Sequence, residues 1–438
     1  MMIICSYVYK GIKLKMDMKI VGKQIKQLYP NNELKSFIKT FQRSKKELIE
    51  WKPLQKKSNG YIDVIDFFSG CGGMSLGFSA IGKSKIFNLI GAVDINQKAL
   101  DSYETNFKCK TLNKDIKELC NADGVKLIRE EFNLPKMKIR PLVIIGCAPC
   151  QGFSAHRKKN WDKDDERNTL IGAFTDTAIK LNPDFIVMEN VPEILGKKYW
   201  EHYDEARRIL EDNDYNVKQT IYNSASFGVP QARYRAIIIA SKMDFEFPLP
   251  ILEKKQFKTV RDAISDLPKV AAGEVAHNDK FHKSAKHKAS TIETISQIPK
   301  DGGKRPSGIG PKCLDKVNGF SDVYGRLYWD KPSVTLTQYS RNPASGRFTH
   351  PEQNRGLTIR EAARIQSFPD SFEFQGSLDD CFKQIGESVP PLLSIAVATQ
   401  ILRAFAKVSE SDDYRIESIT NPVKSSFVSQ LISGAISL

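Results

Sequence analysis

The 438-residue sequence contains no apolar run close to 18 residues, the length that a membrane-spanning helix requires. The apolar stretch at its start, Met1 to Tyr9, is too short for a secretory signal, and polar residues follow it. Its eight cysteines are scattered, and a chain without an export signal keeps such thiols reduced. We therefore expect a soluble cytoplasmic protein with no membrane contact and no disulfide framework.

Acidic residues are scarce relative to basic ones, since 51 Asp and Glu face 66 Lys and Arg, a net charge of +15. Nucleic acid is the most common polyanionic partner of a basic intracellular protein. The excess is concentrated in residues 1–60, which hold 14 Lys and Arg against 4 Asp and Glu. This segment is either an accessory nucleic-acid-binding arm or a solubilising leader before a later start at Met16 or Met18. Four of its apolar residues have a spacing that predicts one face of a short helix: Leu34, Phe37, Ile38 and Phe41.

The most informative stretch is an apolar, β-branched run over 141–145 that stops at Gly146. Such a run is typical of a buried parallel strand, so the residues after it form a loop at the carboxyl end of a strand. Open α/β sheets present ligands and reacting groups at that edge. The group presented here is the thiol of Cys150, behind the rigid Pro149. Cys150 is therefore the first candidate nucleophile.

Other interpretations of Cys147 and Cys150 remain open. A Cys-x-x-Cys after a strand is also a dithiol oxidoreductase signature, and it is compatible with two buried structural thiols. A zinc site would need a second pair of ligands, and the other cysteines supply none at the required spacing. These are Cys5, Cys71, Cys109, Cys120, Cys313 and Cys381.

A glycine-rich turn lies between a predicted strand at 61–68 and a predicted helix at 75–81. Glycines let the backbone turn tightly and approach a ligand beside helix-terminal N–H groups. The next strand, predicted at 89–93, is followed by Asp94, and a carboxylate at this place typically binds a ribose diol. The pattern predicts a doubly wound α/β domain that binds a nucleotide-like cofactor.

Asp115 and Ile116 follow a third short segment and have two interpretations. They could hold an adenine between a carboxylate and an aliphatic wall. Equally, Asp115 could cap a helix that begins at Ile116.

A second buried strand, predicted at 183–188, brings Glu189 to the same sheet edge as Cys150. A carboxylate beside a candidate thiol indicates a reaction site, whereas the alternative is a solvated charge at a strand end. Arg233 and Arg235 lie two residues apart, directly before a later strand, and the alternation of side chains in a strand places both on one face. We therefore expect their guanidinium groups to converge on one carboxylate or phosphate.

Six short segments, in this order along the chain, resemble the sequence blocks of DNA (cytosine-5) methyltransferases of the bacterial restriction-modification type. They are Asp66–Met74, similar to the cofactor loop, Pro149–Gln151, similar to the catalytic loop, Glu189–Val191, Gln231–Arg235, Arg360–Gln366 and Gly386–Pro390. The resemblance covers about residues 61–405 and leaves out the basic extension. Asp94 stands where many members have Glu, and Glu387 where many have Asn.

The resemblance implies a mostly parallel, Rossmann-like methyltransferase sheet that binds S-adenosylmethionine, with a smaller loop-rich target-recognition domain and no metal. The implied catalytic residues are Cys150, Gln151, Glu189, Arg233 and Arg235. The implied cofactor-binding residues are Phe68, Ser69, Gly70, Cys71, Gly72, Asp94, Ile95, Asp115, Ile116, Pro149, Ser388 and Val389. Cys150 would add to C6 of a flipped-out cytosine, Glu189 would act at N3, and the polar segment 156–166 would close over the base.

The implied organisation has five parts: a basic, helical extension (1–60), a catalytic domain (61–248), a target-recognition domain with hinge (249–375), a returning segment (376–407) and a tail (408–438). The expected partner is double-stranded DNA. We further expect a monomer that is cytoplasmic and nucleoid-associated, and related to a cognate restriction endonuclease only through function. A transfer RNA cytosine-5 methyltransferase, a catalytically silent DNA-binding relative and a dithiol oxidoreductase are the alternatives.

Overall fold

The computed structural model describes residues 8–9, 12–13, 18–135, 138–149, 169–315, 322–408 and 416–424. Its centre is a seven-stranded sheet of order β5-β4-β3-β6-β7-β9-β8, in which every neighbouring pair is parallel except the two pairs that β9 makes. The strands are β3 (Ile62–Phe67), β4 (Phe87–Asp94), β5 (Lys110–Asn113), β6 (Leu142–Gly146), β7 (Phe185–Asn190), β8 (Asn216–Asn223) and β9 (Tyr234–Ser241). The predicted α/β class with a mostly parallel sheet is confirmed.

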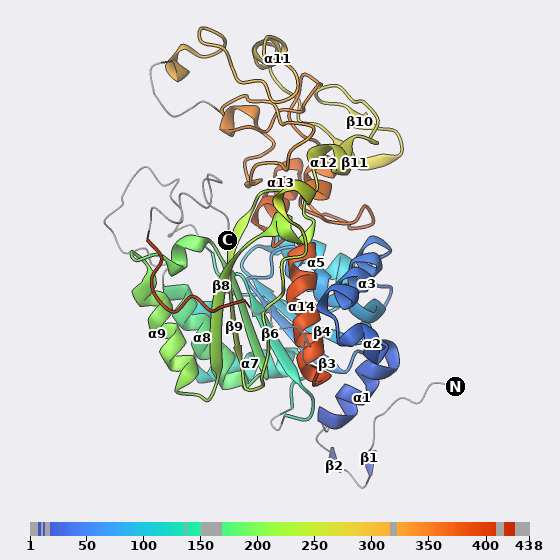
Figure 1. Ribbon diagram of the computed structural model, residues 1–438, viewed down its shortest axis with the longest axis vertical. Coiled ribbons are helices and arrows are strands. Elements are labelled where there is room, and N and C mark those ends of the chain that lie inside the picture. The colour runs from blue at the N-terminus through green and yellow to red at the C-terminus, as the bar shows by residue number, and fades with distance from the viewer. Residues whose placement is uncertain are drawn as a thin grey trace.

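Helices cover both faces of this sheet (Figure 1). One layer holds α4 (Gly73–Ala80), α5 (Gln97–Phe107) and α14 (Pro391–Phe405); the other holds α6 (Ile116–Leu119), α7 (Ala122–Glu131), α8 (Thr169–Leu181) and α9 (Trp200–Glu211). Alternate residues of a strand join opposite cores: Val64 packs toward α14, and Ile65 toward α8. Both faces are buried, which explains the nearly continuous apolar runs of the strands.

The chain visits β3, β4 and β5 on one side of the sheet and then returns to β6 beside β3. The strand order therefore reverses between β3 and β6. In an open α/β sheet the carboxyl ends at such a reversal form the ligand-binding crevice. The segments that leave β3 and β6 are the glycine-rich turn and the Cys147–Pro149 loop.

The N-terminal layer, defined as residues 18–49, packs against the outer side of α14 (Figure 1). It consists of α1 (Met18–Leu28), α2 (Asn31–Leu34) and α3 (Phe37–Ile49). A buried network fixes it, since Tyr29 donates to the Glu47 carboxylate (2.6 Å), which also accepts the N–H of Gly82 (2.8 Å). The Arg403 guanidinium of α14 donates to the carbonyl of Leu34 (2.8 Å).

One detail of the extension was predicted wrongly. Leu34, Phe37 and Phe41 are fully buried, but Ile38 is 46% exposed. Ser36 caps a new helix, so Leu34 ends α2 and does not share a helix with the other three. Ile38 follows Phe37 directly, and one residue of α-helix rotates a side chain by about 100° away from the buried face.

Residues 249–315 and 322–375 form a loop-rich lobe that contacts the carboxyl edge of the sheet (Figure 1). Its short elements are α10 (Val260–Ile264), β10 (Val275–Ala276), β11 (Asp279–Lys283), α11 (Ala289–Ser296) and α12 (Ile359–Ile365). The buried side chain of Arg326 donates to the carbonyls of Ile295, Ile298 and His350. Buried guanidinium groups thus satisfy backbone carbonyls that regular structure would otherwise pair.

The remaining elements connect these parts. They are α13 (Leu378–Glu387), the strands β1 (Val8–Tyr9) and β2 (Ile12–Lys13), and 3₁₀ turns at Ile81–Ser84, Pro192–Leu195, Ser224–Phe227, Lys254–Gln256, Lys312–Leu314 and Pro343–Ser345. Residues 416–424 lie along the edge strand β8, where Ile419 N donates to Gln219 O (2.8 Å). In the described ranges no single helix has the length and apolar composition that a membrane span needs. The pair α13 and α14, bent by 41°, meets those two criteria only when the helices are taken together.

Candidate functional site

The predicted site residues gather at the strand-order reversal, at the carboxyl ends of β3, β4, β6 and β7. The loop after β6 is joined to β3 because Cys147 N donates to Phe67 O (3.3 Å). Pro149 is half-buried at the end of the described part of this loop. Cys150, Gln151 and the predicted closing segment 156–166 lie outside the described residues.

The glycine-rich turn has left-handed backbone at Phe68 (φ 52°), Gly70 (φ 52°) and Gly72 (φ 94°). The glycines have different tasks. A Cβ on Gly72 would collide with the rings of Phe107 and Tyr103, so this glycine lets α5 pack closely. A Cβ on Gly70 would meet nothing within 4 Å. Gly70 is thus the glycine of the turn that faces open space, as a ligand-approach position requires.

Asp94 holds this turn in place from the end of β4. Its Oδ2 accepts the N–H of Gly70 (2.8 Å), and its Oδ1 accepts the N–H of Asn96 (2.8 Å). Burial raises the pKa of Asp94 above its usual range. The next side chain, Ile95, is 68% exposed and offers an apolar surface beside the carboxylate. The turn, the carboxylate and the exposed aliphatic group are therefore adjacent in the structure.

Asp115 caps α6, which was one of its two interpretations. Its Oδ1 accepts the N–H of Lys117 (2.9 Å), and the Glu118 carboxylate accepts the N–H of Asp115 in return (3.3 Å). Ile116 is only 3% exposed and belongs to the core beneath α6. The cap is confirmed. Adenine binding by Asp115 and Ile116 remains a prediction.

Behind the turn, Cys71 and Ser388 connect the cofactor loop to the junction of α13 and α14. The Cys71 Sγ lies 3.3 Å from the Ser388 Oγ, which donates to the carbonyl of Gln384 (2.6 Å). Burial raises the pKa of Cys71 to about 12, so this thiol stays neutral. Ser69 and Val389 are also buried.

Glu189 is 7% exposed and lies near the end of β7, next to the loop that carries Pro149. Its Oε1 is 2.8 Å from Nε of Arg235, which comes from the neighbouring strand β9. Arg233 instead donates to the carbonyls of Leu336 (3.0 Å), Gly386 (3.1 Å) and Ser388 (3.2 Å). Arg235 therefore reaches a carboxylate, while convergence of Arg233 on the same carboxylate or on a phosphate remains a prediction. β9 begins only at Tyr234, so strict strand alternation does not extend to Arg233.

Cys147 lies at the end of β6 with its Sγ 3.7 Å from the Met74 sulfur. Burial, followed by the Glu189 and Asp66 carboxylates, raises the pKa of Cys147 well above its usual value. A thiol must ionise to attack as a nucleophile, and these surroundings keep Cys147 protonated at neutral pH. This disfavours a dithiol reaction and leaves Cys150 as the reactive candidate of the pair.

Sequence reasoning missed two positioning residues, Asn190 and Gln231, although both lie inside the segments it singled out. Asn190 Nδ2 donates to Ala148 O (3.4 Å) and so steadies the loop that precedes Cys150. Gln231 Oε1 accepts the N–H of Leu336 (2.9 Å), which ties the lobe to the start of β9. Both amides act through backbone partners far away in sequence, and no local pattern indicates those partners.

Asp66 was also missed as an individual residue. It is 1% exposed in β3, and the Ser75 hydroxyl donates to its Oδ2 (2.6 Å). Burial raises the pKa of Asp66 to about 8, so the side chain is mainly neutral at pH 7. Among the described residues, no group of three or more His, Cys, Asp and Glu side chains could hold a metal ion.

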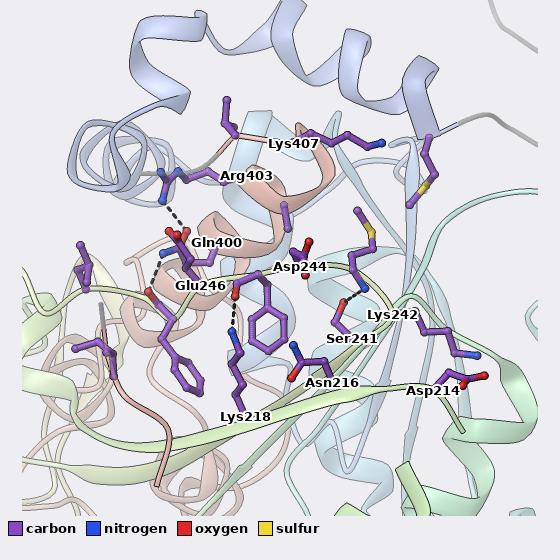
Figure 2. A pocket seen from close by; sticks show the side chains of 18 residues that line it. Asp214, Asn216, Lys218, Ser241, Lys242, Asp244, Glu246, Gln400, Arg403 and Lys407 are labelled. Carbon is purple, nitrogen blue, oxygen red and sulfur yellow. Dashed lines mark hydrogen bonds between the residues drawn. The ribbon is translucent and has the colours of Figure 1, made fainter. Parts of the chain in front are cut away.

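A groove of about 930 Å³ lies at the opposite edge of the sheet, where β8 begins and α14 ends (Figure 2). Three of its cations are already engaged, because Arg403 donates to Gln400 Oε1 (2.8 Å) and two lysines also have acceptors. Lys218 donates to Phe245 O (2.9 Å), and Lys242 donates to Asn182 Oδ1 (3.0 Å). The groove contains none of the predicted site residues, so its size does not identify the reaction site.

Residues 62–403 match the C-5 cytosine-specific DNA methylase family. The chain is 36% identical over 346 residues to the Type II methyltransferase M1.HphI of Haemophilus parahaemolyticus, covering 78% of this chain and 87% of that protein. It is 30% identical over 362 residues to the Type II methylase M.HgiDII of Herpetosiphon aurantiacus, covering 81% and 98%. A solved structure described as a prophage-encoded DNA modification methyltransferase of E. coli has a TM-score of 0.62 and 25% identity, covering 78% and 99%.

Proposed function

Because the chain belongs to the C-5 cytosine-specific DNA methylase family, we propose that it methylates C5 of a cytosine within a specific sequence of double-stranded DNA, using S-adenosylmethionine. The family and the DNA cytosine-5 methyltransferase activity predicted from the sequence are confirmed. The cofactor, the roles of single residues and the specific target belong to the proposal. The observation that carries it is the meeting of the Gly70–Asp94 turn, the Cys147–Pro149 loop and the Glu189–Arg235 pair at one sheet edge.

The turn at the end of β3 fits S-adenosylmethionine in shape and chemistry. Gly70 leaves open space, Asp94 offers carboxylate oxygens for a ribose diol, and Ile95 offers an exposed apolar surface for an adenine. Phe68, with its ring beside that of Phe174, would contact the same ligand. When bound, the cofactor supplies an electrophilic methyl group on a sulfonium.

Cytosine C5 is a poor nucleophile, so the ring must first be activated. In the proposed reaction the Cys150 thiolate forms a bond to C6, and the electrons of the C5–C6 double bond become available at C5. C5 would then bond to the methyl group as the bond from that methyl to the sulfonium sulfur breaks and a neutral thioether leaves. The C5 proton would be lost to a base, and the Cys150–C6 bond would break to restore the double bond. Cys150 returns as a thiolate, so the enzyme is unchanged after each cycle.

Glu189 is the group proposed to act at N3 of the cytosine, where addition at C6 develops negative charge. Its ion pair with Arg235 holds the carboxyl in one orientation beside the Pro149 loop. Arg233 is proposed as a positioning residue, because its three carbonyl acceptors join β9, the lobe and the start of α14 around the site.

The base is inaccessible inside a stacked duplex, so the proposal includes flipping of the target cytosine into the site. Sequence choice is assigned to the basic lobe, where residues 251–320 hold 14 Lys and Arg against 8 Asp and Glu. The names of the relatives support a restriction-modification role, in which methylation protects host DNA from a cognate endonuclease. The five-part domain division, the monomeric state and a cytoplasmic, nucleoid-associated location remain part of this proposal.

Transfer of a labelled methyl group from S-adenosylmethionine tests the function. The purified chain is offered duplex DNA, transfer RNA and no nucleic acid, with Cys150→Ala as the inactive control. Label in duplex DNA at C5 of cytosine, at one recurring sequence, is the expected result. Two results would contradict the proposal: labelling of transfer RNA alone, or labelling of DNA by the Cys150→Ala variant.

A further inference from the structure

The N-terminal layer presents lysines on its outer face. Six of them are exposed, and they follow the helices at intervals of three, four or seven residues: Lys19, Lys23 and Lys26 on α1, and Lys35, Lys39 and Lys46 beside or on α3. Residues three, four or seven apart share one side of a helix. Each helix therefore carries a stripe of positive charge, and a seven-residue interval covers about 10 Å along the axis.

Few carboxylates compensate this charge. Residues 18–57 contain eleven Lys and Arg and three Asp and Glu. Glu33 and Glu47 pair with Arg43 (2.9 and 3.5 Å), and Glu50 pairs with Lys83 (3.4 Å). Within the described ranges, Lys23, Lys39 and Lys46 form no ion pair.

The stripes are fixed relative to the catalytic domain. The buried faces of α1 and α3 pack on α14, and the hydrogen bonds of Tyr29 to Glu47 and of Arg403 to the Leu34 carbonyl fix the layer in place. Trp51, directly after α3, donates its indole N–H to Ser79 of α4 (3.1 Å). A tethered, unstructured leader would place its charges at random, whereas this layer holds them on the exposed sides of helices that pack against the catalytic domain.

The layer lies outside the residues that match the family and away from the proposed reaction site. The family match begins at residue 62, and Figure 1 shows the layer on the side of α14 that faces away from the sheet. At Lys45 the layer approaches Gly228, which lies between the Ser224–Phe227 turn and β9. Burial lowers the pKa of Lys45, and the charge of Lys258 in the lobe lowers it further.

We propose that the outer face of the N-terminal layer binds the phosphate backbone of duplex DNA outside the target sequence, as a second contact surface. The proposal rests on the proposed function, which makes duplex DNA the substrate. Lysine stripes suit phosphates because duplex DNA carries one negative charge per about 1.7 Å of its axis, whatever its sequence. The surface would hold the enzyme on long DNA between encounters with target sites and would take no part in base recognition.

The test removes charge without removing the layer, since deleting it would expose the buried rings of Phe37 and Phe41. One variant changes Lys23, Lys39 and Lys46 to Gln, a residue compatible with helices. The control makes the same change of charge on the opposite helix layer, where Lys126, Lys180 and Arg208 become Gln. These cations are exposed but have partners in Glu130, the Cys120 carbonyl and Asp204, so the stability of the control is measured alongside its affinity. Affinity is measured over a salt series on a duplex of about one and a half helical turns around the mapped target and on one of about five turns.

On the long duplex, the layer variant should bind on the order of tenfold more weakly, and its salt slope should fall by about 3, roughly one unit for each of the three lysines that no longer neutralises a phosphate. On the short duplex, its affinity and methylation rate should equal those of the parent and the control. Unchanged binding of the long duplex, or an equal loss in the control, would overturn the proposal. A loss of the same size on the short duplex would also overturn it, since it would place the lysines at the target site. Absence of methylation by the parent chain would instead refute the proposed function.

Discussion

Removing the Asp94 carboxylate perturbs both the stability of the cofactor turn and the binding of the cofactor. Asp94 accepts hydrogen bonds from the backbone N–H groups of Gly70 and Asn96, each at 2.8 Å. In Asp94→Ala both N–H groups lose their acceptor. In Asp94→Asn one oxygen remains, and the new amide nitrogen, itself a donor, cannot accept from the second N–H.

The size of the effect follows from those two bonds. A hydrogen bond to a charged group contributes about 1.5–3 kcal/mol, and the partial exposure of Asp94 favours the lower end of that range. Asp94→Ala should therefore lower the free energy of unfolding by about 3 kcal/mol, and Asp94→Asn by about half as much. Removal of the proposed ribose hydrogen bond should in addition raise the dissociation constant of S-adenosylmethionine about tenfold.

Denaturant unfolding without cofactor measures the first effect, and calorimetric titration of the folded variants measures the second. Asp101→Asn is the matched control, because the Asp101 carboxylate accepts hydrogen bonds from the side chains of Gln97 and Lys98 on the surface of α5 and holds no turn. Full stability of Asp94→Ala would refute the role of the carboxylate in the turn. Unchanged cofactor affinity in that variant would refute the ribose contact.

Three further predictions concern the core, pH dependence and the buried ion pair. Phe41→Ala should lower the free energy of unfolding by about 3–5 kcal/mol in a denaturant titration, because this fully buried ring packs against Phe227; a loss below 1 kcal/mol would mean that the N-terminal layer does not share the core. The folded pKa of Asp66 is about 8, above its unfolded value, so its contribution to stability is complete below pH 4 and is lost at about 1 kcal/mol per pH unit as the pH rises toward 8. The free energy of unfolding measured from pH 5 to 8 should fall with that slope in the parent and less steeply in Asp66→Asn. Equal slopes in the two proteins would contradict the raised pKa. Arg235→Gln leaves the Glu189 carboxylate buried without its cation, so stability should fall by about 3 kcal/mol and methyl transfer at least tenfold at saturating cofactor; parental rates would show that the pair does not orient Glu189.

Local patterns predicted the elements that surround the site. The apolar run at 141–145 corresponds to β6, Leu142–Gly146, and the turn after β3 has the left-handed glycines that its composition indicated. Strands buried on both faces have a short, continuous apolar signature, and glycine at a tight turn has few substitutes. These signals depend on neighbours in sequence and can therefore be interpreted without the fold.

Contacts between distant segments could not be predicted in the same way. The spacing of Arg233 and Arg235 suggested one shared partner, yet Arg233 bonds to carbonyls at Leu336, Gly386 and Ser388, about 100 to 155 residues away. Ile38 fitted a helical spacing but became exposed once Ser36 started a new helix. In each case tertiary packing determined the partner, and the residue pattern only limited the possibilities.

The central claim is that Cys150 forms a covalent bond to C6 of the target cytosine. DNA that carries 5-fluorocytosine at the mapped target tests it most directly, because the fluorine at C5 cannot leave as the proton does and the adduct accumulates. With S-adenosylmethionine present, the parent chain and Cys147→Ser should each form a denaturation-resistant complex with this DNA, and Cys150→Ser should form none. A complex formed by Cys150→Ser but not by Cys147→Ser would contradict the account.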